Sequence, residues 1–220
     1  MKEEYYFIST NALILCKGVI FLEGVFMRKE EMKKLAFCAL FGALGFVLML
    51  LEFPLPIIPS FVKLDFSELP ALIVSFVYGP LYGISVCLLK NLLHLFVTTS
   101  AGVGEVSNFI LGAIFVGVAG LIYKYNKNRK YALIGSLVGA LVMAVISIVS
   151  NYYIVYPAFS VLCGLPMPAI IGMYQAILPS VDGLLEALVI FNLPFNFAKG
   201  IIDAAICFLI YKKLSPILKK

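Results

Sequence analysis

The sequence has few charged residues. Only 13% of its 220 residues are Asp, Glu, Lys or Arg, against roughly 25% in a soluble domain. Hydrophobic residues make up 62%. These proportions exclude a water-soluble globular domain. Apolar runs of about 20 residues recur along the chain, and each is long enough to cross a ~30 Å hydrocarbon layer. The sequence therefore indicates an integral membrane protein.

Motifs for catalysis and for metal binding are also missing. No GxxxxGK[ST] occurs, which excludes ATP hydrolysis by a P-loop. There is no HExxH, and no Cys and His pair has the spacing of metal ligands. His94 is the single histidine and no GxSxG is present, so a Ser and His hydrolase would depend on His94 alone. We expect no enzyme, no catalytic residue, no metal and no catalytic cofactor.

The cysteines and the basic residues have equally plain interpretations. The five cysteines are widely spaced and form no CxxC. This spacing indicates that they serve as small apolar residues and do not form a disulfide framework. The net charge is +5, and most basic residues form short clusters beside apolar runs. That pattern orients membrane helices and predicts no nucleic-acid binding.

Six spans are predicted, and the fold class is an all-α membrane bundle. Basic clusters precede the first span and follow the fourth and the last, so the positive-inside rule predicts that both termini are cytoplasmic. The three outward connections, 53–66, 98–104 and 157–191, contain one Lys and no Arg. Loops of such length are often functional. The spans cover residues 33–52, 67–78, 80–97, 105–124, 131–156 and 192–212.

The first 31 residues are interpreted as a separate extension. They mix apolar pieces with Asn11, Lys17 and Glu23, and they lack a signal-peptide cleavage site. A charged stretch from Met27 to Lys34 then precedes the first span. We expect Met27 or Met32 to be the native start, residues 1–31 to be dispensable, and residues 32–220 to form the membrane domain.

Polar side chains within the spans are few and gather toward the outer side. Each costs roughly 2.5–3.5 kcal/mol at mid-depth, so each marks a site, a pair or a cavity. The 1.5 Å rise per residue places most of them in the outer half, beneath the three long connections. We expect Asn151, Asn196 and Lys199 to share one hollow there. The residues are Lys90, Asn91, His94, Glu105, Asn108, Asn151, Asn196, Lys199 and Asp203.

Structural roles are weighed against binding roles for these residues. Lys199 could pair with Asp203 one turn away. It could instead face a ligand, and in that case the substitution Lys199→Ala would cause little loss of folding. Lys90 could pair with Glu105 or extend to the interface. His94 suits an interhelical hydrogen bond, and Asn151 could join two helices.

The first predicted span also carries small residues at helical spacing. Ala39 and Ala43 lie on one face, which allows another helix to approach closely. The spacing does not decide whether that helix belongs to this chain or to another subunit.

Several motifs in order resemble the riboflavin-specific substrate-binding (S) component of energy-coupling factor (ECF) transporters. The likeness covers about residues 32–213. The motifs are Lys63 to Leu72, Gly79-Pro80, Lys90 to His94, Gly102 to Glu105 with Asn108, Asn151 to Tyr153, and Pro194 to Gly200.

The resemblance implies a six-helix protein of the plasma membrane that binds riboflavin, or its phosphate FMN, from outside. It implies as partners a transmembrane coupling subunit, which Ala39 and Ala43 would contact, and two ABC ATPase subunits. The implied ligand contacts are Asn151, Asn196 and Lys199, with Leu64 and Asp65 from the first outward loop. Weaker candidates, from depth and from aromatic character, are Phe66, Glu105, Asn108 and Tyr152.

Two alternatives are kept. The same architecture could bind thiamine, a folate or a modified-base precursor. A proton-coupled secondary transporter would instead use Lys90, His94 and Glu105 as a relay.

Overall fold

The computed structural model describes residues 5–6 and 27–218, and the side chains of residues 30–210. The chain divides into two units, residues 1–37 and residues 38–220. In the first, the two-residue strands β1 (Tyr5–Tyr6) and β2 (Met27–Arg28) pair antiparallel. Most of the predicted extension, residues 1–31, lies outside the described residues, so its dispensability stays a prediction.

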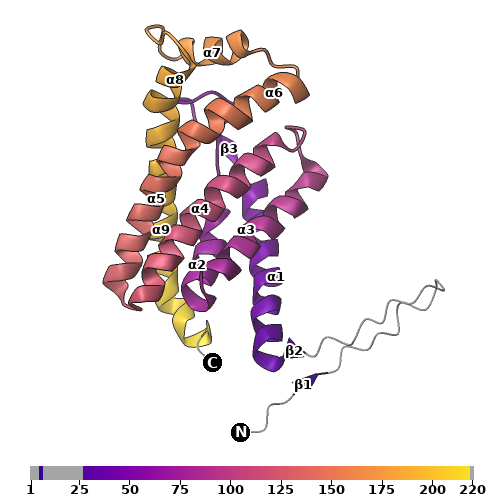
Figure 1. Cartoon of the computed structure of the whole chain (residues 1–220), viewed down its shortest axis with the longest axis vertical. Coiled ribbons are helices and arrows are strands. Elements are labelled where there is room, and N and C mark those ends of the chain that lie inside the picture. Colours follow the sequence, from indigo (N-terminus) through magenta and orange to yellow (C-terminus); the bar gives the residue numbers. More distant parts are fainter. Residues whose placement is uncertain (1–4, 7–26, 219–220) are drawn as a thin grey trace, which may run out of the picture. The chain divides into compact units, whose positions relative to one another are not determined.

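The rest of the described chain is mainly helical, as predicted (Figure 1). A short antiparallel pair, β3 (Phe53–Pro54) with β4 (Lys63–Leu64), closes the first outward loop. The α-helices are α1 (Lys29–Leu50), α2 (Glu68–Tyr78), α3 (Pro80–His94), α4 (Val103–Tyr125), α5 (Arg129–Ser150), α6 (Tyr156–Leu162), α7 (Met167–Gln175), α8 (Leu184–Ala187) and α9 (Leu193–Leu218). A 3-10 turn, η1 (Leu95–Val97), extends α3.

Within the described residues, five helical stretches are long and apolar enough to cross a membrane. The second predicted span, α2, has only 11 residues, about 17 Å at 1.5 Å per residue, and so falls short of a ~30 Å hydrocarbon core. Nine of its residues are buried, as expected for a helix that is apolar on every side. Helices α3, α4 and α9 pack around it.

Glycine shapes the helix packing at two points. Gly79 ends α2 with a φ of +108°, and Pro80 then occupies the first turn of α3. On α5, a Cβ at Gly139 would lie 2.7 Å from the carbonyl oxygen of Phe115. This glycine therefore permits the close contact of α4 with α5.

Two π-helical turns interrupt the long helices at the ends opposite the α4–α5 turn (Figure 1). The turn η2 (Asn151–Val155) joins α5 to α6, and η3 (Leu188–Asn192) joins α8 to α9. A proline, Pro157 or Pro194, follows each turn by two residues. Because proline has no N–H to donate, a wider turn here avoids a broken α-helical ladder. The last span therefore begins at Leu184, before the predicted start at residue 192, and Pro194 lies inside it.

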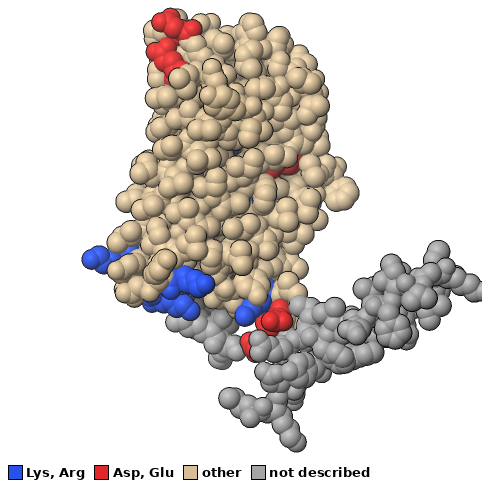
Figure 2. All heavy atoms as spheres, viewed as in Figure 1, with Lys and Arg blue, Asp and Glu red and all other residues tan. Residues whose placement is uncertain are grey.

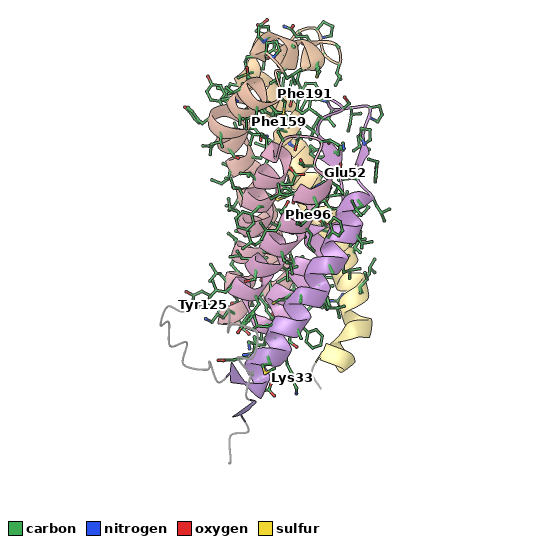
Figure 3. The ribbon with its side chains drawn as sticks, turned by 90° about the vertical axis from the view of Figure 1, so that its right-hand side faces the viewer. Lys33, Glu52, Phe96, Tyr125, Phe159 and Phe191 are labelled. Carbon is green, nitrogen blue, oxygen red and sulfur yellow. The ribbon has the colours of Figure 1, made fainter. Side chains whose placement is uncertain are left out.

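Charged side chains are few on the surface between the two ends. Figure 2 shows Lys and Arg at one end with acidic side chains beside them, a group of acidic side chains at the other end, and a single acidic patch between the ends on the face in view. The basic end includes the α4–α5 turn, with Lys124, Lys127, Arg129 and Lys130. In Figure 3, Glu52, Phe159 and Phe191 lie at the end opposite Tyr125.

Candidate functional site

A cavity of about 230 Å³ lies among the ends of the helices below the first outward loop. Asn151, Asn196 and Lys199 all line it, together with three further predicted residues, Asp65, Glu105 and Asn108. The three residues expected in one hollow therefore share it. Their role in binding a ligand stays a prediction.

Three of the predicted residues lie elsewhere. Leu64 is buried and lines a neighbouring apolar cavity of about 320 Å³. Phe66 lines neither cavity. Tyr152 is 39% exposed and meets the ring of Tyr153 edge to face. The binding candidates therefore concentrate on the polar residues rather than on these aromatic rings.

Lys199 joins α9 to the first outward loop and to α2. Its Nζ lies 2.8 Å from Asp65 Oδ2 and 2.9 Å from Glu68 Oε2, and all three side chains are buried. The alternative pairing with Asp203 is wrong, because Lys199 pairs with these two carboxylates. Both carboxylate oxygens of Asp203 are buried without a hydrogen-bond partner in the described part of the chain.

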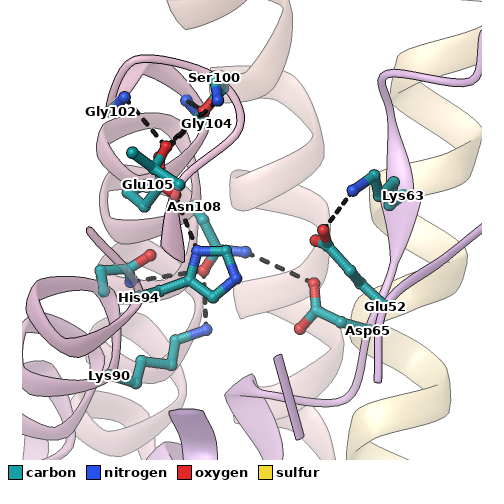
Figure 4. A network of polar contacts seen from close by, with 12 residues as sticks. Glu52, Lys63, Asp65, Lys90, His94, Ser100, Gly102, Gly104, Glu105 and Asn108 are labelled. Carbon is teal, nitrogen blue, oxygen red and sulfur yellow. Dashed lines mark hydrogen bonds and ion pairs between the residues drawn. The ribbon is translucent and has the colours of Figure 1, made fainter. Parts of the chain in front are cut away.

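Lys90 holds the opposite side of the same network. Its Nζ donates to Glu68 Oε1 at 2.9 Å, to Asn108 Oδ1 at 2.7 Å and to the Ser67 hydroxyl. Figure 4 shows Asn108 between Lys90 and Asp65. The expected pairing of Lys90 with Glu105 is wrong, because Glu68 is closer to the lysine and takes that role.

Glu105 instead pairs with the single histidine. Its Oε1 lies 2.8 Å from His94 Nδ1, and its Oε2 accepts from the Ser100 hydroxyl at 3.0 Å. The contact joins α3 to α4 and agrees with the interhelical role expected for His94. The residues of the suggested proton relay are thus divided between two separate contacts.

Sequence reasoning missed Glu68, which pairs with both Lys90 and Lys199. A signal for it was present in the sequence, because Glu68 lies inside the second predicted span. Burying its charge there costs as much free energy as burying the other charged groups within the spans. Through its two oxygens it links α2 to α3 and α9.

Asp65 is ionised despite its burial. Burial alone would raise the pKa of its carboxyl group, but the ammonium groups of Lys199 and Lys90 hold that pKa well below its ordinary value. The Ser67 amide also donates to Asp65 Oδ1 at 2.8 Å. The loop carboxylate is therefore a permanent partner for Lys199 at neutral pH.

A hydrogen-bonded group from the last outward connection covers this end of the cavity. The Tyr174 hydroxyl donates to Asn192 Oδ1 at 2.6 Å, and Asn192 Nδ2 donates to the Tyr156 hydroxyl at 3.0 Å. Burial raises the pKa of the Tyr174 phenol, so it stays protonated as a donor. Asn192 and Tyr156 also line the cavity. Sequence analysis did not predict this group, because its three residues are brought together only by the folding of α7 and the two π turns.

The lining offers hydrogen bonds without a surplus positive charge. Two lysines, Lys63 and Lys199, face four carboxylates in the lining, and each lysine is paired with a carboxylate. The Asn196 amide donates to the Asn192 carbonyl at 2.8 Å, which leaves its oxygen for another donor. Asn151, 5% exposed, presents a complete amide to the cavity. Such a site suits a small, uncharged, hydrogen-bonding ligand, and the fold and site together define a membrane-embedded binding protein.

Comparisons with known proteins agree with this class. Residues 33–211 match the family model "ECF transporter, substrate-specific component". The chain is 36% identical over 189 residues to "Riboflavin transporter FmnP" of Bacillus subtilis (strain 168), covering 84% of this chain and 94% of the relative. It is 31% identical over 194 residues to "Riboflavin transporter RibU" of Staphylococcus aureus (strain TCH60), covering 88% and 96%.

A solved structure is also similar. The chain described under "Structure and mechanism of the S component of a bacterial ECF transporter" matches with a TM-score of 0.68 and 31% identity, over 86% of this chain and 99% of that one. This protein therefore belongs to the family of ECF transporter substrate-specific components. Membership confirms the predicted family, the multi-pass membrane location and the expectation that the chain is not an enzyme.

Proposed function

We propose that this protein is the riboflavin-binding subunit of an ECF-type importer, which captures riboflavin outside the cell for ATP-driven uptake. The observation that carries the proposal is the shared cavity of Asn151, Asn196 and Lys199. The names of the relatives support the vitamin. We further propose six spans with both termini inside, which places the basic α4–α5 turn in the cytoplasm and the cavity at the outer side.

Riboflavin suits the chemistry of this cavity. Its pyrimidine edge alternates donors and acceptors, and the amides of Asn151 and Asn196 offer the complementary groups. The polar cavity alone is smaller than the ~300–1,000 Å³ of typical ligand pockets. It shares Phe195 and Lys199 with the neighbouring apolar cavity. The two together accommodate a polar ring edge and an apolar ring, once the lining side chains move apart.

The charge balance favours riboflavin over FMN. A phosphate brings close to two negative charges, and no cation among the lining lysines stands without a carboxylate nearby. Binding FMN would therefore require a paired lysine to leave its carboxylate, which costs desolvation energy.

The test is titration of the purified protein with riboflavin, followed by quenching of flavin fluorescence. Thiamine, folate and FMN serve as comparison ligands. We expect riboflavin to bind, FMN to bind more weakly and the other two not to bind. Binding of thiamine or folate in place of riboflavin would overturn the proposal.

Two variants test the site itself. Asn151→Leu removes an amide of the cavity without adding charge, and loss of a hydrogen bond worth ~0.5–1.5 kcal/mol weakens riboflavin binding ~2–10-fold. Tyr152→Phe is the neighbouring control, because Tyr152 lies outside the cavity lining. Equal losses in both variants would show that Asn151 is not a specific contact.

We also propose that this chain works with a transmembrane coupling subunit and two ABC ATPase subunits. Ala39 and Ala43 are exposed on α1. On the side of the same helix that faces α3, a Cβ at Gly42 would lie 2.5 Å from Leu89. That side therefore packs within the chain, which leaves the alanine face for the coupling subunit.

A further inference from the structure

A second pocket, of about 290 Å³, lies at the end of the molecule that carries the basic residues. It is formed between the α2–α3 turn and the last turns of α4, with Tyr78, Tyr82, Tyr123, Lys124 and Lys127 in its lining. We call it the tyrosine–lysine pocket. Among the residues whose side chains the structure describes, its lining contains no Asp or Glu, in contrast to the cavity described above. The described lining therefore carries a net positive charge.

The two lysines supply the binding charge of this pocket. Gly79 and Pro80 line it at the start of α3, and the first turn of a helix carries a partial positive charge. Proline has no N–H, and the N–H of Tyr82 already donates to the Gly79 carbonyl, so this turn adds little hydrogen bonding. The ends of α2 and α4 carry the opposite partial charge. Lys124 and Lys127 are therefore the groups that would attract a phosphate.

The position of the pocket indicates which phosphate it meets. Tyrosines of membrane proteins concentrate at the headgroup level, and three of them line this pocket at the ends of apolar helices. Leu81 also belongs to the lining and is 76% exposed. An apolar side chain beside a positive pocket suits a ligand with both a phosphate and hydrocarbon.

We propose that the tyrosine–lysine pocket binds the headgroup of an anionic phospholipid. The phosphodiester lies between Lys124, Lys127 and the start of α3, and an acyl chain runs along Leu81. Basic pockets between membrane helices bind anionic headgroups in this way. The site is independent of the vitamin cavity, so its test does not depend on the transported ligand.

The test must separate a specific site from the general positive charge of this end. The double variant Lys124→Gln/Lys127→Gln removes two charges from the pocket. The control Arg129→Gln/Lys130→Gln removes two charges from the adjacent start of α5, outside the lining. Both pairs are exposed, and circular dichroism verifies that each variant keeps its helix content.

The measurement is the rise in thermal unfolding temperature when phosphatidylglycerol, or phosphatidylcholine as the zwitterionic comparison, is added to the full chain in detergent. We expect phosphatidylglycerol to stabilise the wild type and the control, and the pocket variant to lose at least half of that rise. Lys124→Arg/Lys127→Arg should retain it. Equal losses in the two Gln variants would overturn the proposal.

Two further outcomes would also overturn it. Inorganic phosphate could stabilise the protein as well as phosphatidylglycerol does, which would show a free-anion site. Alternatively, the pocket variant could keep its full response to lipid and fail only to assemble with the coupling subunit, which would show a protein-docking surface.

Discussion

Lys199 combines a structural role with the binding role proposed for it, in one buried side chain. Its ammonium group compensates Asp65 and Glu68 and also lines the cavity. Removing one partner of a buried ion pair leaves an uncompensated charge, which costs more than the pair itself contributes. The expectation that Lys199→Ala spares folding is therefore replaced by one of marked destabilisation.

Lys199→Met should lower the free energy of unfolding by ~3–5 kcal/mol, because two carboxylates lose their partner. Lys199→Arg, which keeps the charge, should lose less. Thermal unfolding of the detergent-solubilised protein measures both. Adding Asp65→Asn to Lys199→Met removes one of the stranded charges and should recover part of the loss. An unchanged unfolding temperature in Lys199→Met would contradict the pairing.

Asp65 should make stability depend on pH in the acid range. Its pKa is lowered in the folded state, so its contribution is complete above the unfolded pKa of ~3.9 and is lost as the pH falls below that value. The stability difference between wild type and Asp65→Asn should therefore shrink from pH 6 to pH 3. Asp182→Asn, at an exposed site, should show no such trend. Denaturation at a series of pH values measures both.

At the scale of the elements, the two π turns position the outer ends of the long helices. Each accommodates a proline that follows it, and each contributes an asparagine to the cavity, Asn151 from η2 and Asn192 from η3. π turns occur frequently at functional sites because they change the direction in which side chains project. Here they let two membrane helices continue as the cover of the cavity.

Close helix packing depends on glycine at specific positions. Gly139→Ala should destabilise the protein by ~1–3 kcal/mol, because the added Cβ would meet the Phe115 carbonyl at 2.7 Å. Gly172→Ala on α7 is the matched control. A Cβ there meets nothing within 4 Å, and alanine favours the helix by ~1 kcal/mol. Opposite shifts in unfolding temperature are expected, and a shared sign would contradict this account of the α4–α5 contact.

For the whole molecule, binding and transport should be separable. Ala39→Leu enlarges the exposed face of α1 far from the cavity lining, so riboflavin binding should remain while uptake in cells with the coupling subunits falls at least tenfold. Ala205→Leu makes the same change at an exposed position of α9 and should leave uptake intact. Normal uptake in Ala39→Leu would remove α1 from the docking surface.

Much of the site could be predicted, because burying a polar group in a membrane is costly and each such group must serve a purpose. This reasoning identified Asn151, Asn196 and Lys199, and the family resemblance implied Asp65. All four line the cavity. The same reasoning failed for the pairing of the charges, because helical spacing reports only neighbours on one helix. Lys199 reaches Asp65, 134 residues away in the chain, in preference to Asp203 one turn away.

The amino-acid sequence by itself determined the membrane location, the helical class and the gathering of polar groups near one surface, since these follow from composition and from the length of apolar runs. Only the tertiary structure decided which carboxylate meets which lysine, that α2 is a short buried helix, and that Tyr174 and Asn192 cover the cavity. Those outcomes depend on which helices become neighbours, and contacts between distant segments leave no periodic signal in a single sequence.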